Sequence, residues 1–404
     1  MIPEGWERST VAEISAVPVS YGVVQTGDPV EKGVPCVRVV DIANGDLNPA
    51  SMITTSQEIS AAYSRTVLKE GDLMIALRGI IGQTAQVTSE LEGCNLTRGI
   101  ARISPKKGAA TSDFLLQSLN GPEFKNLINR RANGSALQEI SIATLRKAPV
   151  LLPPISEQRR IAETLKTWDR AIETVEALIA NARAQKQALK QQLLPQGTTP
   201  PKKRLPGFSG DWREIRLGTA FTERVERGED GLALLSVTQA SGVIPQEDAG
   251  RRNISSVDQS KYKTVCAGDI AYNTMRMWQG ASALSGLTGK VSPAYTVVTP
   301  RNGHDALFYS YLFKQPKMIH VFERHSQGLV SDTWNLKFPH FAKIRIRVPG
   351  IEEQVAIAAA IKSVDDLTVA YEGQLTALRQ EKAALMQQLL TGKRRVKIPE
   401  GEVA

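Results

Sequence analysis

The stretch LPPISEQRRIAETLKTWDRAIETVEALIANARAQKQALKQQLL, from Leu152 to Leu194, determines how this chain is organised, because it occurs twice. Its second version, VPGIEEQVAIAAAIKSVDDLTVAYEGQLTALRQEKAALMQQLL, runs from Val348 to Leu390. The Glu-Gln pair near the start and the Gln-Gln-Leu-Leu at the end recur with the same offset of 196 positions, so no residue has been inserted or lost between them. The two stretches are therefore copies of one element.

The apolar residues of each copy follow the period of a coiled coil. Steps of four and three residues alternate for about five heptads, which predicts one long helix per copy. Such a helix, of roughly 38 residues, is about 57 Å long, too long to bury its apolar stripe against a small domain. Pairing with the other copy is the interpretation we favour over an ordinary bundle helix. The seam residues that would meet are Ile161, Leu165, Trp168, Ile172, Ile357, Ile361, Val364 and Leu375.

The residues between the two copies leave two arrangements open. A globular domain there can return the chain to the start of the first helix, or carry it to the far end. The second arrangement would pair the helices antiparallel, with one globular domain at each end and pseudo-two-fold symmetry.

The parts of the chain outside the helices are also duplicated. The turns Gly71-Asp72 and Gly268-Asp269 each lead into a short apolar run. A β-branched run at 35–42, which predicts a strand, has its counterpart at 233–238. The loops that follow the Gly-Asp strands differ completely between the halves. A shared framework with different loops is what two recognition domains with different targets would need.

The composition is that of an ordinary soluble protein, with 42% hydrophobic and 23% charged residues. No apolar run of 18 or more residues is present and no apolar signal segment follows Met1, so we expect a cytoplasmic protein that does not enter a membrane. Three scattered cysteines, Cys36, Cys94 and Cys266, fit a reducing compartment and argue against a structural metal. The net charge of +9 suggests a polyanionic partner without identifying one.

Motifs of common catalytic sites are missing from the sequence. The segment Gly286–Lys290 lacks the spacing of a phosphate-binding Walker loop. Amino-methyltransferases hold their target base with an Asn/Asp-Pro-Pro-aromatic motif, but Leu152-Pro153-Pro154-Ile155 has neither its polar first residue nor its aromatic last. All four histidines lie in the second half, whereas a catalytic site shared by duplicated modules would repeat in both. We expect no catalytic residue and no metal site in this chain.

Taken together, these features resemble the DNA specificity subunit of type I restriction-modification enzymes over nearly the whole chain. The resemblance rests on the helix starts Pro153–Gln158 and Pro349–Gln354 and on the two Gln-Gln-Leu-Leu ends. The stretch Gly268–Gly280, followed by Val291–Tyr295, also looks like a recurrent version of that family's target recognition domain. The second helix start departs from the pattern at Gly350, which we expect to affect only the turn.

The resemblance implies that each globular module reads one half of a split, asymmetric DNA site, and that the paired helices act as a ruler. It also implies docking of two modification subunits, which use S-adenosylmethionine to methylate adenine at N6, and of a restriction subunit, a motor-nuclease that uses ATP and Mg. This chain itself would hold no cofactor. The helix length limits the distance between half-site centres to about 17 base pairs, and one turn of DNA, roughly 10 base pairs, is the more natural separation.

We therefore predict a duplicated α/β (α+β) fold, with two globular target recognition domains joined by two long antiparallel helices that form a pseudo-two-fold symmetric coiled coil. The predicted boundaries are 1–152 for the first recognition domain, 153–195 for the first spacer helix, 196–210 for a basic linker rich in Pro and Gly, 211–348 for the second recognition domain, 349–392 for the second spacer helix and 393–404 for a basic tail.

Candidate base-reading residues are polar side chains in the parts that differ between the halves, because Arg can bond guanine, and Asn or Gln adenine, through two atoms at once. In the first domain they are Arg78, Gln83, Thr97, Arg98, Asn133 and Ser135. In the second domain they are Asn273, Arg276, Trp278, Gln279, Tyr295, His325, Ser326 and Gln327. A core position explains Trp278 as well as a DNA contact does.

Candidates for phosphate contact, which positions a protein without reading sequence, are Arg130, Arg131, Lys147, Lys261 and Lys263. A coiled-coil scaffold with two protein-binding heads is the alternative from another functional class. It predicts no salt-dependent affinity for DNA, whereas a specificity subunit predicts a steep salt dependence. A self-sufficient modification enzyme is disfavoured by the missing methyltransferase motif.

Overall fold

The computed structural model describes residues 2–132, 139–196, 199–229, 231–238, 242–250, 260–330 and 333–398. The chain divides into two compact units. Unit 1 comprises Met1–Glu176 with Gly373–Ala404, and unit 2 comprises Ala177–Glu372. Each unit contains one globular part and a segment of both long helices, so each is built from residues that lie far apart in the sequence. In the described part of the chain, no helix has both the length and the apolar character needed to cross a membrane.

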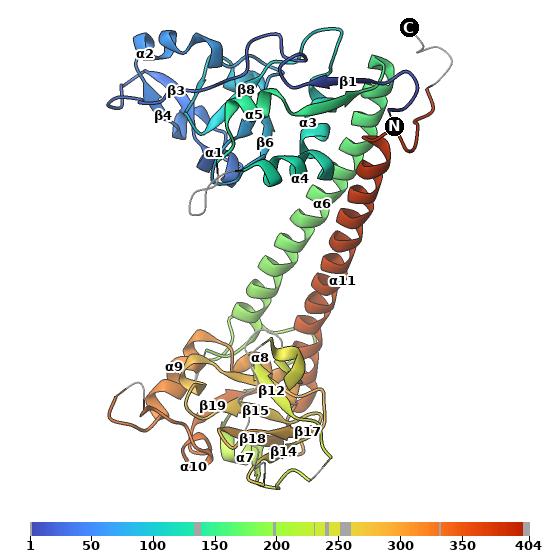
Figure 1. Cartoon of the computed structure of the whole chain (residues 1–404). Helices are drawn as coiled ribbons and strands as arrows, with labels where there is room; N and C mark the ends of the chain where they lie inside the picture. The colour runs from blue at the N-terminus through green and yellow to red at the C-terminus, as the bar shows by residue number, and fades with distance from the viewer. Residues whose placement is uncertain are drawn as a thin grey trace. The chain divides into compact units, whose positions relative to one another are not determined.

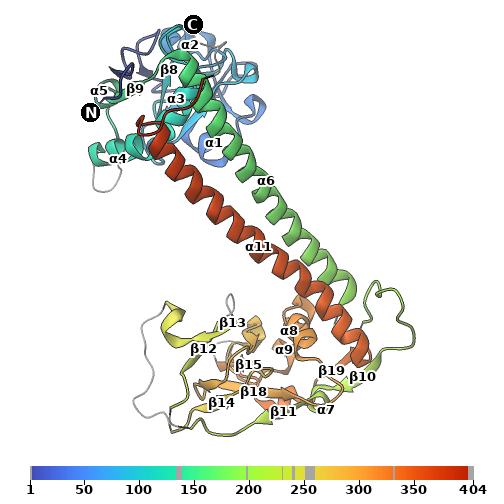
Figure 2. The ribbon, with the colours of Figure 1, turned by 90° about the vertical axis from the view of Figure 1, so that its right-hand side faces the viewer.

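The two long helices are α6 (Ile155–Leu193) and α11 (Ile351–Leu389), each of 39 residues. Within each unit their segments run side by side (Figures 1 and 2). Ion pairs show the direction in which the helices pair. As the residue number of the α6 partner rises, the residue number of the α11 partner falls. In unit 1 the pairs are Asp169–Lys382 and Glu176–Arg379, and in unit 2 they are Arg183–Glu372 and Lys186–Asp365. The helices are therefore antiparallel, as predicted.

The seam residues are covered to different extents. Ile161 and Leu165 of unit 1 are fully buried, and so are Ile357 and Ile361 of unit 2, with Val364 nearly so. The four isoleucine and leucine residues belong to the hydrophobic cores of the globular parts, not only to a helix–helix contact. The remaining predicted seam residues are half-buried: Trp168, Ile172 and Leu375.

The globular part of unit 1 is built on a four-stranded antiparallel sheet. Its order is β2 (Ser20–Tyr21), β8 (Ile100–Ile103), β5 (Leu73–Ala76) and β6 (Thr84–Gln86). A second sheet contains β4 (Ile53–Thr55), β3 (Val34–Val37) and β7 (Asn95–Leu96), and β1 (Glu7–Thr10) pairs with β9 (Pro149–Leu152). The helices are α1 (Val39–Asn44), α2 (Gln57–Ala62), α3 (Ser112–Asn120), α4 (Pro122–Arg131) and α5 (Ile142–Arg146).

Unit 2 repeats this framework with a four-stranded antiparallel sheet of its own. Its order is β11 (Phe221–Arg224), β18 (Tyr295–Pro300), β15 (Ile270–Asn273) and β16 (Ser282–Leu284). Two-stranded pairs are formed by β10 (Arg213–Arg216) with β19 (Arg345–Val348), β12 (Leu235–Thr238) with β13 (Gly242–Pro245), and β14 (Lys263–Val265) with β17 (Gly289–Val291). The helices are α7 (Leu217–Ala220), α8 (Ala306–Leu312), α9 (Pro316–His325) and α10 (Phe338–Phe341). The duplicated architecture inferred from the sequence is confirmed.

The repeated Gly-Asp turns precede the central strands β5 and β15. Both glycines have a positive φ, 83° at Gly71 and 91° at Gly268, which favours glycine. Each aspartate is buried and accepts a backbone N–H three residues back, which closes the turn. An arginine neutralises each carboxylate, but Arg102 comes from β8 whereas Arg224 comes from β11. Both units therefore neutralise the buried aspartate with an arginine, but the arginine comes from strands at different places in the sheet.

The Glu-Gln pair at the start of each long helix joins the helix to the globular part. The buried amide of Gln158 accepts a hydrogen bond from the Thr111 backbone N–H (2.9 Å) and donates to the carbonyls of Ala109 and Pro153 (2.9 Å each). Gln354 likewise accepts from the Asp305 N–H at 3.0 Å. Thr111 and Asp305 are the N-cap residues of α3 and α8, so the same contact is made in both units.

The glutamate of each pair is buried and neutralised by an arginine that follows the end of the other long helix. Glu157 accepts two hydrogen bonds from Arg395 (2.7 Å each) and one from the Trp6 indole N–H (3.1 Å). Glu353 accepts two from Arg204, at 2.9 and 2.5 Å. Paired, hydrogen-bonded geometry is what makes a buried carboxylate tolerable.

One secondary-structure prediction was wrong. The run 35–42 is not a single strand, because β3 ends at Val37 and α1 begins at Val39. Arg38 is the N-cap of α1, where the Asp41 carboxylate accepts its backbone N–H and its guanidinium N–H groups, and Gly45 ends the helix in the left-handed conformation. These local hydrogen bonds outweigh the β propensity of the two valines.

Candidate nucleic-acid interface

Several first-domain candidates surround an open hollow of about 530 Å³ on unit 1. Arg78, Thr97 and Arg98 line it, together with Arg38, which the sequence did not single out. Its apolar wall is formed by valines, namely Val23, Val24, Val39 and Val40. We call this site the arginine hollow.

Arg38 is held in place at the edge of the arginine hollow. Its Nε and Nη2 donate to the carboxylate of Asp41, at 3.1 and 2.7 Å, and this hydrogen bonding raises the pKa of Arg38. Asp41 also accepts the backbone N–H of Arg38 at 2.7 Å. Only one edge of the guanidinium is used in this pair, so the other edge can donate to a second acceptor such as a base.

Arg78 and Arg98 are both exposed. They flank the same end of the adjacent antiparallel strands β5 and β8. Arg78 follows β5, and its backbone forms an isolated antiparallel β-bridge with Glu139. Arg98 precedes β8, and its backbone N–H donates to the Val23 carbonyl at 2.9 Å. Gly99 leaves room for Arg78, because a Cβ at that position would lie 2.9 Å from Arg78 Nε and 2.7 Å from Val39 Cγ2. The hollow therefore depends on a glycine as well as on its arginines.

Thr97 lines the hollow, but its hydroxyl donates to the Val37 carbonyl at 3.0 Å. Gln83 is not brought to the hollow. Its amide donates to the Ile42 carbonyl at 3.2 Å and ties the loop after β5 to α1. The other two candidates of the first domain, Asn133 and Ser135, lie outside the described residues.

In unit 2 the corresponding loop, residues 274–280, is fixed at both ends. The Leu336 N–H donates to the Thr274 carbonyl at 2.8 Å, and Lys314 Nζ donates to the Gly280 carbonyl at 2.7 Å. Between these anchors Arg276 is exposed and Trp278 is half-buried. We call this segment the tryptophan loop.

Trp278 packs edge-on against Trp334, with ring centroids 5.4 Å apart and planes at 80°. Its indole N–H donates to the Met275 carbonyl at 3.0 Å, so its polar atom stabilises the tryptophan loop itself. Trp334 was missed at the sequence level. Its signal was a tryptophan flanked directly by polar residues, in the run Ser331-Asp332-Thr333-Trp334-Asn335.

The other second-domain candidates mostly bond to nearby backbone. Asn273 caps the start of the tryptophan loop by accepting the Met275 N–H at 3.0 Å, and the Tyr295 hydroxyl reaches the Val237 carbonyl at 3.4 Å. Three candidates cluster at the end of α9 and bond back to α9 or to one another: His325, Ser326 and Gln327. Gln279 is exposed on the tryptophan loop.

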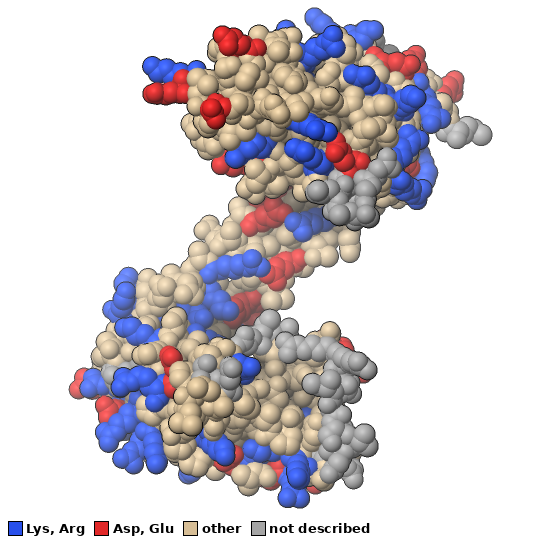
Figure 3. Space-filling model, turned by 60° about the vertical axis from the view of Figure 1, so that its left-hand side comes forward, with Lys and Arg blue, Asp and Glu red and all other residues tan. Residues whose placement is uncertain are grey.

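The phosphate candidates occupy different environments. Arg130 and Arg131 lie in the exposed last turn of α4, and Arg131 shares a small hollow with Lys147. Lys261 is exposed, whereas Lys263 forms an ion pair with Glu223 at 3.6 Å. On the faces shown in Figure 3, Lys and Arg side chains outnumber acidic ones on each unit.

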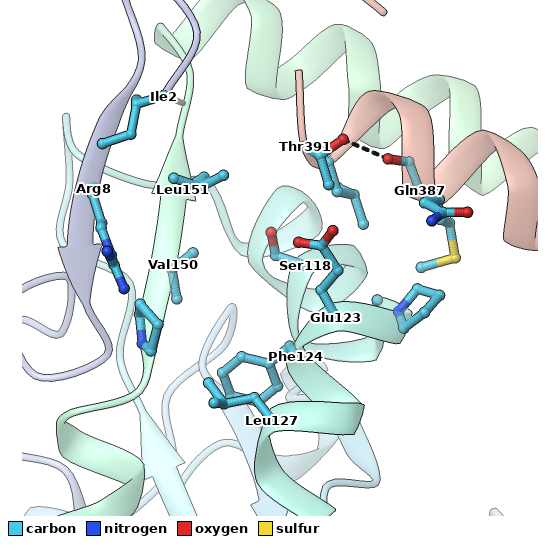
Figure 4. A pocket seen from close by; sticks show the side chains of 15 residues that line it. Ile2, Arg8, Ser118, Glu123, Phe124, Leu127, Val150, Leu151, Gln387 and Thr391 are labelled. Atoms are coloured by element: carbon cyan, nitrogen blue, oxygen red, sulfur yellow. Dashed lines mark hydrogen bonds between the residues drawn. The ribbon is translucent and has the colours of Figure 1, made fainter. Parts of the chain in front are cut away.

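Another hollow in unit 1, of about 370 Å³, lies beside the end of α11 (Figure 4). Its lining is mainly apolar and includes Phe124, Leu127 and Val150, and Thr391 at its rim donates to the Gln387 carbonyl. None of the candidate DNA-contacting residues lines it. Within the described ranges of the chain, no group of three or more His, Cys, Asp or Glu residues is placed to hold a metal ion.

Comparisons with known proteins agree with these features. Residues 3–182 match the family model described as "Type I restriction modification DNA specificity domain". The EcoBI specificity subunit of a type I restriction enzyme from Escherichia coli is 29% identical over 48% of this chain, and the match spans 41% of that protein, less than half of its length. A putative type I restriction enzyme MjaX specificity subunit from Methanocaldococcus jannaschii is 22% identical over 98% of this chain and 95% of its own length.

Among solved structures, the S subunit of a type I restriction-modification system from M. genitalium has the same fold. It aligns with a TM-score of 0.58 at 13% identity and covers 95% of this chain and 96% of that chain. Residues 3–182 thus match a type I restriction modification DNA specificity domain, and over nearly its whole length the chain is similar to type I restriction enzyme specificity subunits.

Proposed function

We propose that this chain is the sequence-specific DNA-binding subunit of a type I restriction-modification complex. Each globular part, 1–152 and 211–348, reads one half of a split, asymmetric site. The spacer helices, 153–195 and 349–392, set the distance between the halves, while the linker 196–210 and the tail 393–404 lead into and away from the second half of the chain.

The observation that carries this proposal is that one framework presents an exposed arginine at equivalent places from two loops of different sequence. The loop after β5 contributes Arg78 to the arginine hollow, and the loop after the equivalent strand β15 presents Arg276. Guanidinium groups recognise guanine O6 and N7 through two hydrogen bonds, each such pair being worth about 1–3 kcal/mol of discrimination. Two different loops on one framework would give two different half-sites.

The valines of the arginine hollow also support the proposed DNA-binding function. Val24 and Val40 are 43% and 47% exposed beside the arginines. Thymine carries a methyl group in the major groove that apolar side chains contact. A hollow with guanidinium donors and a valine wall can therefore distinguish guanine from thymine.

The chemistry of the complex would be performed by partners. Two modification subunits would dock on the helices and methylate adenine at N6 with S-adenosylmethionine, and a restriction subunit would use ATP and Mg to translocate and cleave DNA. The role of this chain would be to bind and orient, with no cofactor of its own.

The test is single-molecule sequencing of genomic DNA from a host that expresses this chain with its modification subunit. We expect N6-methyladenine in one motif of two short halves separated by a fixed gap. Arg276→Ala should change preference at one position of one half, whereas Arg213→Ala, an exposed arginine of β10, should change nothing. No methylated motif from a stable complex, or a uniform loss across both halves with Arg276→Ala, would contradict the assignment.

A further inference from the structure

A polar junction joins the globular part of unit 1 to both of its helix segments. Asp169 of α6 forms an ion pair with Lys382 of α11. The same carboxylate accepts a hydrogen bond from the buried amide of Gln117 on α3, at 2.7 Å. Three elements therefore meet at one aspartate.

Unit 2 contains an equivalent junction with a different residue from the globular part. Asp365 of α11 forms an ion pair with Lys186 of α6. The Tyr311 hydroxyl on α8 donates to the same carboxylate at 2.8 Å, and the Lys186 ammonium lies 5.8 Å from the centre of the Tyr311 ring. The hydrogen bond to Asp365 adds to burial in raising the pKa of Tyr311, so the hydroxyl keeps its proton and remains a donor.

The two junctions occupy corresponding positions in the duplicated sequence. The aspartates are 196 positions apart, and so are the lysines. Gln117 and Tyr311 each lie six residues after the N-cap of their helix. The roles of α6 and α11 are exchanged between the units, as an antiparallel duplicated pair requires.

Such a junction constrains more than a hydrophobic seam can. A charged residue at a seam position fixes the register of a coiled coil, because a slipped register leaves it without its partner. Here the same aspartate also holds α3 or α8, whose first turn is held by Gln158 or Gln354. Two contacts along one short helix fix its direction as well as its position against the long helices.

We propose that the Asp169–Lys382–Gln117 and Asp365–Lys186–Tyr311 junctions are positioning devices that set the gap between the two DNA half-sites. This inference rests on the proposed function. Gln117 and Tyr311 touch no base in this scheme; they transmit the helix register to the recognition domains. In this scheme the length of the helices sets the approximate distance between the recognition domains, and the junctions restrict how far each domain can move relative to the helices.

Tyr311→Phe tests this with the loss of one oxygen atom, and Gln117→Leu is the matching change in unit 1. Tyr21→Phe, at a 44% exposed tyrosine, is the control. The full chain with its modification subunit is titrated with duplexes that carry both half-sites at gaps from two base pairs shorter to two longer than the genomic motif. Binding to duplexes with a single half-site is measured in parallel, as is the melting temperature.

We expect both variants to keep their affinity for single half-sites while preference for the natural gap over its neighbours falls about three- to tenfold, the low range for a hydrogen bond to a half-exposed carboxylate. Equal weakening at every gap, or an unchanged gap preference, would overturn the inference and leave the proposed function standing. A parent complex without any preference for a split site would instead overturn the proposed function and this inference with it.

Discussion

Replacing Gln158 by Ala should loosen α3 in unit 1 and leave α8 in unit 2 unchanged. The side chain is 1% exposed and makes three hydrogen bonds, to the Thr111 N–H and to the carbonyls of Ala109 and Pro153. Truncation leaves these three backbone groups without that partner, at about 1–3 kcal/mol for each group that stays unsatisfied. Water can enter the space that the amide vacates, so we expect about 3–5 kcal/mol in total.

Hydrogen–deuterium exchange of backbone amides, measured by mass spectrometry on the full chain, would detect the loosening of α3 separately from the rest of the chain. A chain of two compact units is not expected to unfold as one cooperative step, so a global unfolding measurement would not assign the loss to one unit. At 1.4 kcal/mol per factor of ten, a loss of about 3 kcal/mol accelerates exchange about 100-fold in the first turn of α3. Peptides that cover α8 serve as an internal reference, since Gln354 is intact there.

Two further variants sharpen the test. Gln158→Glu keeps the size and the acceptor for Thr111 but places a carboxylate oxygen beside two carbonyls, so we expect it to be as damaging as Ala at neutral pH. Gln187→Ala, at an exposed position of α6, should change exchange by less than threefold, within about 0.5 kcal/mol. Similar exchange in Gln158→Ala and the parent, or equal acceleration in both units, would refute the reasoning.

Three other outcomes are expected. Gly99→Ala places a Cβ 2.7 Å from Val39 and 2.9 Å from Arg78, so it should cost roughly 1–3 kcal/mol in melting experiments and blur one position of the unit 1 half-site. Burial raises the pKa of Cys36 to about 11, so its neutral thiol stabilises the fold below the unfolded pKa, and this contribution, about 3 kcal/mol at most, is lost as pH rises through 11. Urea midpoints at pH 8 and 10.5 should therefore fall less for Cys36→Ala than for the parent. Trp334→Ala removes the edge-on contact with Trp278, worth about 0.5–1.5 kcal/mol beyond its area, and methylation sequencing should show weaker discrimination in the unit 2 half-site only.

The long helices could be predicted because a heptad repeat reports a face that one partner must cover. The period does not report how completely each position is covered. Ile161 and Leu165 are buried by the globular core as well as by α11, whereas Trp168 and Ile172 lie further along α6 and stay half-buried. Burial at each seam position therefore depends on the third element, which no helical period describes.

The candidate site was predicted less completely, because side-chain direction depends on tertiary contacts. Arg78 and Gln83 belong to one loop and looked equivalent, yet Arg78 lines the arginine hollow and Gln83 bonds to Ile42 of α1. Arg38 was overlooked because its run reads as a strand, whereas the hydrogen bonds from Arg38 to the Asp41 carboxylate accompany the start of a helix there. An Arg with an Asp three residues later was the available signal.

The residues that anchor each globular part are separate from the exposed arginines that we propose to read DNA. The anchors of each globular part are Glu-Gln pairs on the long helices, and the arginines that neutralise the glutamates follow the helix ends. Exposed Arg78 and Arg276 follow the central strands and take no part in those contacts. Under the proposed function, replacing one of these arginines would alter the surface offered to DNA without removing an anchor, whereas replacing an anchor such as Gln158 or Gln354 would disturb the globular part of its unit as a whole. This separation permits the loops of the two units to differ completely while their helix starts remain nearly the same.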